Sequence, residues 1–428
     1  MKNTVPYAAL FAIAFSCDAF ANDDERKKTV HTPPPEESET YDDKLLGSMW
    51  GLRHKLDDHG VALTVAYKGD VWSVMDGGIN TGQNYLDNFD ARMDIDNEKL
   101  FGLEGNTAAI HFTNNAGGKP NLRRIGSSIG IDNIEVIKNA PILYEAWDQQ
   151  HFFDKKLSLR VGMMDVNNEF IYTESGLNFL SPVQQLSQTL AQSGKNGPPT
   201  FPYTKPGARL KYEPIKSYYA QFAVFNGLAG DPQHLYGTNV EFDGNMLLIG
   251  EVGYKPDVEG TESHPNLLAI GGWTYTHSFN DLLTVDANGN AVRSRSEGLY
   301  ALSSWQLYKD GERDLTTFFR PSMADGDTRQ AKYAYEVGVQ THGFMPPRPK
   351  AEMGLAMSQV MNGDKHMTAQ RDAGNLPKRS EYAIEGYYRD TVLPGITLQP
   401  DLQYIINPGT VRGRNNAVAV GMRTEIQF

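Results

Sequence analysis

Three stretches of the sequence carry residue types that catalyse reactions or bind metals in other proteins. One is GSSIG at residues 126–130, which matches the G-x-S-x-G pattern around a nucleophilic serine. That pattern requires a strand before Ser128 and a helix after it. Here a loop rich in Gly, Pro and Arg precedes the serine, and IDNIEV follows it. We therefore predict no catalytic serine, and the chain is not expected to be an enzyme.

The other two are candidate metal ligands. The acidic residues of DIDNE at 94–98 resemble the start of a calcium-binding loop, but Lys99 replaces the turn glycine and no glutamate closes the loop. The histidines form no H-x-H or H-x-x-x-H pair of the kind that binds zinc. The sequence therefore predicts neither a metal site nor a cofactor, and strand alternation explains the acidic residues better.

In several stretches of the sequence, charged or polar residues recur at every second position, separated by apolar residues. In NFDARMDID at 88–96, the charged Asp90, Arg92 and Asp94 alternate with apolar side chains. The same period occurs at residues 157–164, 218–224 and 417–428. A period of two is the signature of a β-strand with two different faces. The strands that must position these charges therefore present one charged face and one apolar face.

The stretch LQPDLQYIINPG at 398–409 shows the two ways in which such a strand can be used. Leu398 and Leu402 share one face, and Asp401 and Gln403 share the other. A soluble sandwich gives this pattern between its core and water. A membrane barrel gives it between lipid and a water-filled channel, and a sheet can span lipid only by closing on itself.

Three features favour the barrel. The polar faces carry full charges, the strands number about sixteen, and the last strand ends on the aromatic Phe428. Short turns such as 153–156 and 213–216 also alternate with long connections rich in Gly, Asn and Pro. We predict an all-β fold, an outer-membrane antiparallel β-barrel with a short N-terminal periplasmic helix.

Four segments are predicted along the chain. They are a signal peptide at 1–21, a flexible charged and Pro-rich tether at 22–42, an amphipathic helix at 43–60 and a transmembrane barrel at 61–428. The signal ends in the A-x-A pattern Ala19–Ala21; a lipoprotein signal ending at Cys17 fits less well because Phe15 is bulky. Cleavage removes Cys17, the single cysteine, so no disulfide is expected.

Composition excludes two further classes of protein. The chain is 40% hydrophobic, and its one long uncharged apolar run is shorter than a spanning helix, which argues against a polytopic helical membrane protein. The net charge of −12 argues against a nucleic-acid partner.

Four stretches of the sequence resemble the carbohydrate-selective porins of the OprB type. They are LLGSMWGLRHKLDDHGVALTVAYKGDVW near the start, LYEAWDQQHFFDKKLSLRVGMMDVNNEF in the middle, PGARLKYEP with FAVFNG, and LQPDLQYIINPG near the end. The resemblance covers essentially the whole mature chain, although Leu52 stands where a second glycine would be expected after Trp50 and Gly51. It implies a sixteen-stranded barrel in a Gram-negative outer membrane, passive diffusion of sugars, and a constriction formed by inward-folded loops.

A sugar pore needs polar groups that replace the hydration of hydroxyls and aromatic faces that stack on the sugar ring. Strand parity places the following candidates on the inner face: Arg92, Glu145, Trp147, Arg160, Arg209, Lys211, Glu251, Trp273 and Asp401. Arg160 and Arg209 are favoured because a guanidinium offers a rigid fork of donors to neighbouring hydroxyls. Parity also places Glu385, Arg389, Arg423 and Glu425 inside, and Tyr275 and His277 beside Trp273. Any one of these residues could instead solvate the lumen or pair with another.

The segment 166–206 is the longest stretch without a strand pattern and is the candidate constriction loop. Three alternatives stay open: a general or anion-preferring porin of the same fold, a barrel enzyme, and a sugar-binding barrel plugged by this loop. The expected partners are small carbohydrates, outer-membrane lipid and, through the strand ending at Phe428, the barrel assembly machinery. The barrel could be a monomer or a homotrimer.

Overall fold

The computed structural model describes residues 41–230, 238, 240–242, 244–256, 265–345 and 347–428. The predicted signal peptide and nearly all of the predicted tether lie outside the described residues. Among the helices that are described, none is both long enough and apolar enough to cross a membrane.

Sixteen antiparallel strands form one closed barrel, in which each strand pairs with its neighbours in sequence and β1 closes the ring against β16. The strands are β1 (Val61–Gly78), β2 (Gly82–Asp96), β3 (Asn106–Gly117), β4 (Pro141–Phe152), β5 (Leu157–Met164), β6 (Lys205–Ile215), β7 (Tyr218–Asn226), β8 (Met246–Tyr254), β9 (Leu267–Val285), β10 (Ala291–Asp310), β11 (Arg313–Ala324), β12 (Ala331–His342), β13 (Glu352–Asn362), β14 (Ser380–Leu393), β15 (Ile396–Ile406) and β16 (Asn415–Gln427). The predicted all-β barrel of about sixteen strands is confirmed.

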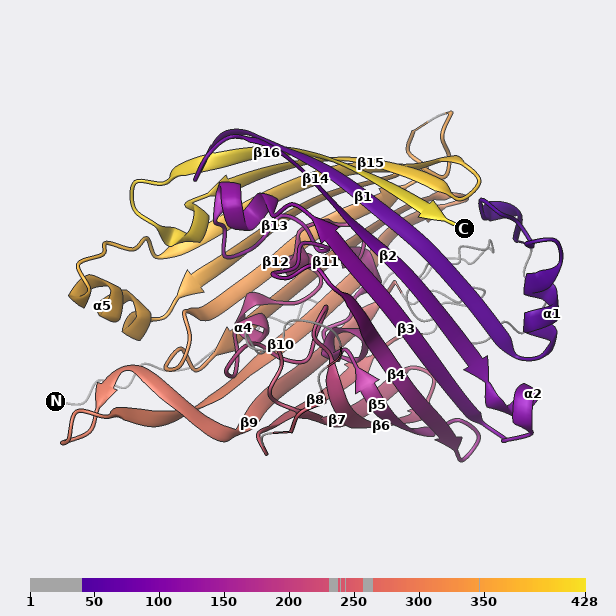
Figure 1. Ribbon diagram of the computed structural model, residues 1–428, viewed down its shortest axis with the longest axis horizontal. Helices are drawn as coiled ribbons and strands as arrows, with labels where there is room; N and C mark the ends of the chain where they lie inside the picture. Colours follow the sequence, from indigo (N-terminus) through magenta and orange to yellow (C-terminus); the bar gives the residue numbers. More distant parts are fainter. Residues whose placement is uncertain (1–40, 231–237, 239, 243, 257–264, 346) are drawn as a thin grey trace.

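Helices are short and lie outside the sheet. They are α1 (Leu52–Asp58), α2 (Asn97–Phe101), α3 (Val166–Glu169), α4 (Gln188–Ala191) and α5 (Asp364–Asp372), with the 3₁₀ turns η1 (Tyr41–Asp43), η3 (Glu174–Gly176), η4 (Pro182–Gln184) and η5 (Pro408–Thr410), and the π-helical turn η2 (Asn121–Ile125). α1, α2 and the C-terminus lie at one end of the barrel, which we call the C-terminal end (Figure 1). α5 and the tip of the β9–β10 hairpin lie at the other, which we call the loop end (Figure 1).

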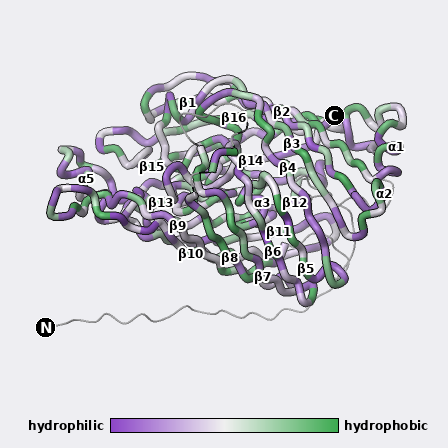
Figure 2. The backbone as a smooth tube through the Cα atoms, turned by 60° about the horizontal axis from the view of Figure 1, so that its bottom comes forward, coloured by the Kyte–Doolittle hydropathy of each residue, from purple (hydrophilic) through white to green (hydrophobic). Residues whose placement is uncertain are grey.

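Each strand directs alternate side chains to the lumen and to the outside, as β15 shows. Gln399, Asp401 and Gln403 are buried on the inner face, and Leu402 is 54% exposed on the outer face. Figure 2 shows the same alternation of hydrophilic and hydrophobic residues along the barrel wall. The outer face collects exposed apolar side chains from many strands, including Val71, Val161, Phe222, Ile270, Leu355 and Val420. The alternation read at 398–409 is therefore that of a barrel wall, with the charges inside.

The N-terminal segment, residues 41–58, contacts the end of β16, the strand that closes the barrel against β1. Arg53 is 2% exposed; its Nη2 donates to the main-chain oxygen of Phe428, and its guanidinium lies 4.9 Å from the ring centroid of Tyr41. The backbone N–H of Leu45 donates to the carbonyl of Gln427 at 2.9 Å. This segment therefore packs on the end of β16.

The helix in this segment is shorter than the predicted range of 43–60. Residues 44–51 form successive turns, and α1 begins only at Leu52. Met49 and Trp50 have φ angles of 50° and 56°, which a right-handed helix excludes. The apolar spacing that indicated a longer helix belongs to a run of turns, in which Trp50 is 96% exposed.

Candidate functional site

Two loops at the loop end fold back into the lumen instead of covering its outside. We call residues 118–140 the first inward loop and residues 165–204 the second inward loop. Ile129 and Ile131 of the first loop and Phe170, Phe179 and Leu190 of the second are 0% exposed. They pack against inward apolar side chains of the barrel in three clusters. Figure 1 shows both loops within the outline of the strands.

Carboxylates of the barrel wall hold these loops by their backbone. Glu145 accepts the N–H of Asp165 at 3.0 Å, and Glu251 accepts the N–H of Ile171 at 3.2 Å. Glu385 accepts the N–H groups of Leu180 and Ser181. Loop N–H groups that lose water inside the barrel need an acceptor, and the oxygens of these carboxyl groups provide one. Three predicted inward acids therefore fix the second loop.

Glu381 explains the GSSIG motif of the first inward loop. Its carboxylate accepts the N–H of Ser128 at 3.0 Å and the hydroxyls of both Ser127 and Ser128. Ser128 thus anchors the first inward loop to β14.

Arg160 and Arg209, the two favoured sugar ligands, converge on one loop carboxylate. Glu169 accepts from Arg160 Nη1 and from Arg209 Nε, the latter at 2.8 Å. Arg209 also donates to Ser158 Oγ at 2.6 Å, and both arginines donate to Gln149 Oε1, at 2.9 Å from Arg160 and 2.7 Å from Arg209. The two guanidinium forks are therefore engaged with the protein, and they hold the start of the second loop.

The two inward tryptophans, Trp147 and Trp273, are covered by neighbouring side chains. The guanidinium carbon of Arg160 lies 3.7 Å from the ring centroid of Trp147, and Trp273 stacks on Tyr300 with centroids 6.2 Å apart. Trp147 is 9% exposed and Trp273 is 4% exposed. Parity placed both side chains inside correctly, but neither offers a free face for a sugar ring.

Parity failed at two positions. Alternation with the inward Glu145 and Trp147 predicts that Tyr144 faces outward, yet it is buried inside and its hydroxyl donates to Asp165. The cause is a register shift between His111 and Phe112, which leaves Tyr144 without a partner in β3 and turns it inward. His277 was grouped with the inward Trp273 and Tyr275, but it is exposed.

Asp401 is 3% exposed and accepts from the side-chain amide of Gln403 at 3.1 Å. Gln403 in turn donates to the carbonyl of Ile131 in the first inward loop at 2.9 Å.

Arg320, which sequence reasoning missed, holds the second loop from β11 through the carbonyls of Val183 and Gln185. Its signal was available, because Arg320 shares the inward parity of Phe318 and Ser322.

A smaller set of inward charges remains partly exposed, and we call them the exposed wall charges. Their side chains are exposed by 29% at Lys68, 20% at Asp90, 15% at Arg92, 21% at Lys211 and 17% at Arg389. Each is paired with an opposite charge: Lys68–Asp90 at 3.6 Å, Arg92–Asp94 at 2.7 Å, Lys211–Glu213 at 2.8 Å and Arg389–Glu425 at 3.0 Å. Of the nine predicted site residues, Arg92 and Lys211 belong to this set.

This architecture defines a class of protein. A closed sixteen-stranded barrel, apolar outside and charged inside, with loops folded into its lumen, is a porin. Residues 80–428 match the family described as "Carbohydrate-selective porin, OprB family". The chain therefore belongs to the OprB family of carbohydrate-selective porins.

Individual relatives agree with this assignment. Porin B of Pseudomonas aeruginosa is 25% identical over 421 residues, covering 90% of this chain and 91% of that protein. The putative porin QuiX of Acinetobacter baylyi is 22% identical, covering 90% of this chain and 93% of that protein. The high-pH structure of Pseudomonas putida OprB superposes with a TM-score of 0.80 at 22% identity, covering 92% of this chain and all of that one.

The family and the fold together establish the class of function. The protein is a carbohydrate porin of the Gram-negative outer membrane, and it is not an enzyme.

Proposed function

We propose that this porin passes small neutral sugars and selects them where the two inward loops narrow the lumen. The observation that carries the proposal is the pairing of the exposed wall charges. Because each cation lies beside a carboxylate, neither anions nor cations meet a wall of one sign. Sugar hydroxyls can both donate and accept, so they exchange hydrogen bonds with both members of each pair.

The nine candidate residues then divide into two roles. Arg92 and Lys211 would contact the solute, because their side chains keep partial exposure to the lumen. The other seven, which are Glu145, Trp147, Arg160, Arg209, Glu251, Trp273 and Asp401, position or pack against the inward loops. The seven loop-positioning residues would therefore set the width of the passage, and Arg92 and Lys211 would set which solutes it favours.

Swelling of liposomes that contain the purified protein tests this proposal. Glucose, a disaccharide, a neutral amino acid and a small anion of similar size would be compared. Faster entry of the sugars than of the size-matched solutes is expected. Equal rates for all solutes would indicate a general porin, and no swelling would indicate a plugged barrel.

A pair of variants sharpens the test. Arg92→Gln should slow sugar entry, because it removes a donor and leaves Asp94 uncompensated in the lumen. Lys309→Gln makes the same charge change at an exposed position beside the 311–312 turn and should leave sugar entry unchanged. An equal effect of both variants would show that the net charge of the protein matters and the position of Arg92 does not.

Export by the 1–21 signal, contact of the apolar outer face with lipid, and recognition of the strand ending at Phe428 by the assembly machinery stay predictions. The same holds for the choice between monomer and homotrimer.

A further inference from the structure

A hollow of about 360 Å³ lies at the loop end, away from the exposed wall charges. Its walls come from residues 191–197 of the second inward loop, from Leu282 on β9 and from residues 328–330 between β11 and β12. This volume falls in the range of small-molecule sites and suits a monosaccharide. No function discussed above uses it.

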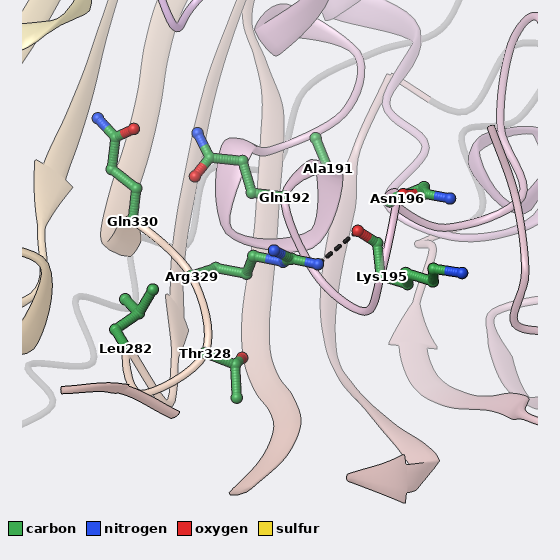
Figure 3. A pocket seen from close by; sticks show the side chains of 9 residues that line it. Ala191, Gln192, Lys195, Asn196, Leu282, Thr328, Arg329 and Gln330 are labelled. Carbon is green, nitrogen blue, oxygen red and sulfur yellow. Dashed lines mark hydrogen bonds between the residues drawn. The ribbon is translucent and has the colours of Figure 1, made fainter. Parts of the chain in front are cut away.

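Hydrogen bonds hold the walls of this hollow in place. Arg329 Nε donates to the carbonyl of Gly194 at 2.7 Å, and Arg329 Nη2 donates to the carbonyl of Lys195 (Figure 3). The backbone N–H of Ala331 donates to Gln192 Oε1 at 3.1 Å, and Gln330 Nε2 donates to Asn362 Oδ1 at 2.9 Å. A site whose side chains are already fixed loses little entropy when a ligand binds.

The groups that remain free in the hollow are mainly donors. Arg329 Nη1, Lys195 Nζ and Asn196 Nδ2 have no hydrogen-bond partner among the described residues, and Asn196 Nδ2 is buried. Gln330 Oε1 is a free acceptor within the same part of the chain. In Figure 3 the Arg329 guanidinium points toward the main-chain oxygen of Lys195, with Gln192 above it and Thr328 below it. Donors and positive charge therefore exceed acceptors.

Among the described residues, no carboxylate lines this hollow, although acids lie near it. Asp281 and Asp327 are bound by Lys365 at 2.5 and 3.0 Å. Asp325 lies behind Thr328, whose hydroxyl donates to it at 3.5 Å. Asp325 offsets part of the charge of Arg329, but no acidic residue of the described lining pairs with Arg329 or Lys195, in contrast to the paired exposed wall charges.

We propose that this hollow binds a monosaccharide acid, a six-carbon sugar that carries one carboxylate. The carboxylate would accept from Arg329 Nη1 and draw on the charge of Lys195. The sugar hydroxyls would use Asn196 Nδ2 and Gln330 Oε1, and the C–H face of the sugar would lie against Leu282. Such a site would collect sugar acids at the mouth of a lumen that otherwise favours neutral sugars.

Calorimetric titration of the detergent-solubilised protein with D-glucuronate and with D-glucose tests the site. The two sugars differ by one carboxylate, so their comparison isolates its contribution. Glucuronate should bind about tenfold more tightly, the difference that one charge-assisted hydrogen bond provides. Higher salt should reduce that preference, because Coulomb attraction at a solvent-open site is screened. Equal binding of the two sugars would overturn the proposal.

A matched pair of variants locates the binding. Leu282→Glu adds a carboxylate to the hollow and should abolish the preference for glucuronate. Leu283→Glu adds the same charge at the next residue, which is 40% exposed and does not line the hollow, and should keep the preference. A preference that survives Leu282→Glu would place the binding elsewhere and reject the site. Lys195→Gln, which removes the charge of an exposed side chain, should weaken glucuronate binding and leave glucose binding unchanged.

The titration is independent of conduction. A protein that binds glucuronate but does not swell liposomes would contradict the pore proposal and support the site. A protein that passes sugars but binds glucuronate and glucose equally would support the pore proposal and contradict the site.

Discussion

The second inward loop is held in two different ways on two sides of the barrel. On β5 and β6, Arg160 and Arg209 bind the side chain of one loop residue, Glu169. On β14, Glu385 binds the backbone N–H groups of Leu180 and Ser181. The basic side therefore depends on the identity of a single loop residue, whereas the acidic side accepts any loop sequence that keeps its backbone path.

Burial also distinguishes charges that the second inward loop covers from charges that remain partly exposed to the lumen. Arg209 and Glu169 have side chains that are 4% and 7% exposed, and Lys211 two positions further on is 21% exposed. All three lie inside the barrel, but only the last keeps contact with the lumen. Position under or beside a loop decides the role of a charge as much as its parity does.

The largest effect on stability and ion selectivity is expected when Glu169, the carboxylate shared by Arg160 and Arg209, is replaced. Glu169→Gln leaves two buried guanidinium groups without their carboxylate, which costs about 3–5 kcal/mol when a buried pair loses one partner. The start of the second loop should detach, and the freed arginines should make the pore prefer anions. Melting temperature and the reversal potential of planar bilayers in a salt gradient measure the two results. An unchanged reversal potential would show that the arginines stay covered.

A smaller loss is expected on the acidic side. Glu385→Ala leaves the N–H groups of Leu180 and Ser181 without an acceptor, at about 1–3 kcal/mol for each buried group. Glu385→Gln keeps a carbonyl oxygen in the same place and is the matched control. Proteolysis of the 165–204 loop should be faster in the alanine variant than in the glutamine variant. Equal cleavage of the two would mean that the negative charge, and not the acceptor, holds the loop.

The free energy of unfolding should depend on pH through Asp165, the first residue of the second inward loop. Burial, reinforced by the charge of Glu145 and opposed by the Tyr144 hydrogen bond, raises the pKa of Asp165 from 3.8 to about 6. A carboxyl whose pKa is higher in the folded than in the unfolded protein destabilises the fold as pH rises through that interval. The free energy of unfolding should therefore fall by about 2 kcal/mol between pH 4 and pH 7 on account of this group. Asp165→Asn should remove that part of the pH dependence in melting experiments, and an unchanged slope would assign it to other groups.

The smallest effect is expected at an exposed pair. Lys211→Gln breaks the ion pair with Glu213 in a partly hydrated lumen, where such pairs contribute up to about 1 kcal/mol. Stability should hardly change, but the uncompensated Glu213 should shift the pore slightly toward cations. A loss of stability as large as that of Glu169→Gln would remove the distinction between loop-holding and solute-facing charges.

The inward faces could be predicted because side chains alternate strictly in a strand. Asp401 and Arg160 were placed inside from parity alone, and both lie there. One of the two errors inside strands, Tyr144, follows from a bulge, which adds a residue that no pattern in the sequence marks. The sequence predicts a longer helix than α1, because apolar spacing does not reveal the left-handed backbone at Met49 and Trp50.

What the sequence determined by itself was the barrel, its two faces and the identity of one of the two loops that enter it; the first inward loop, residues 118–140, was not predicted. These follow from local rules: the period of two, the cost of a charge in lipid, and the length of a segment without strand pattern. Only the tertiary structure decided that Arg160 and Arg209 hold Glu169, that Glu385 holds a loop backbone, and that Arg329 borders a separate hollow. Those contacts join residues far apart in the chain, and their partners are fixed by how two loops fill a closed lumen, which no local pattern records.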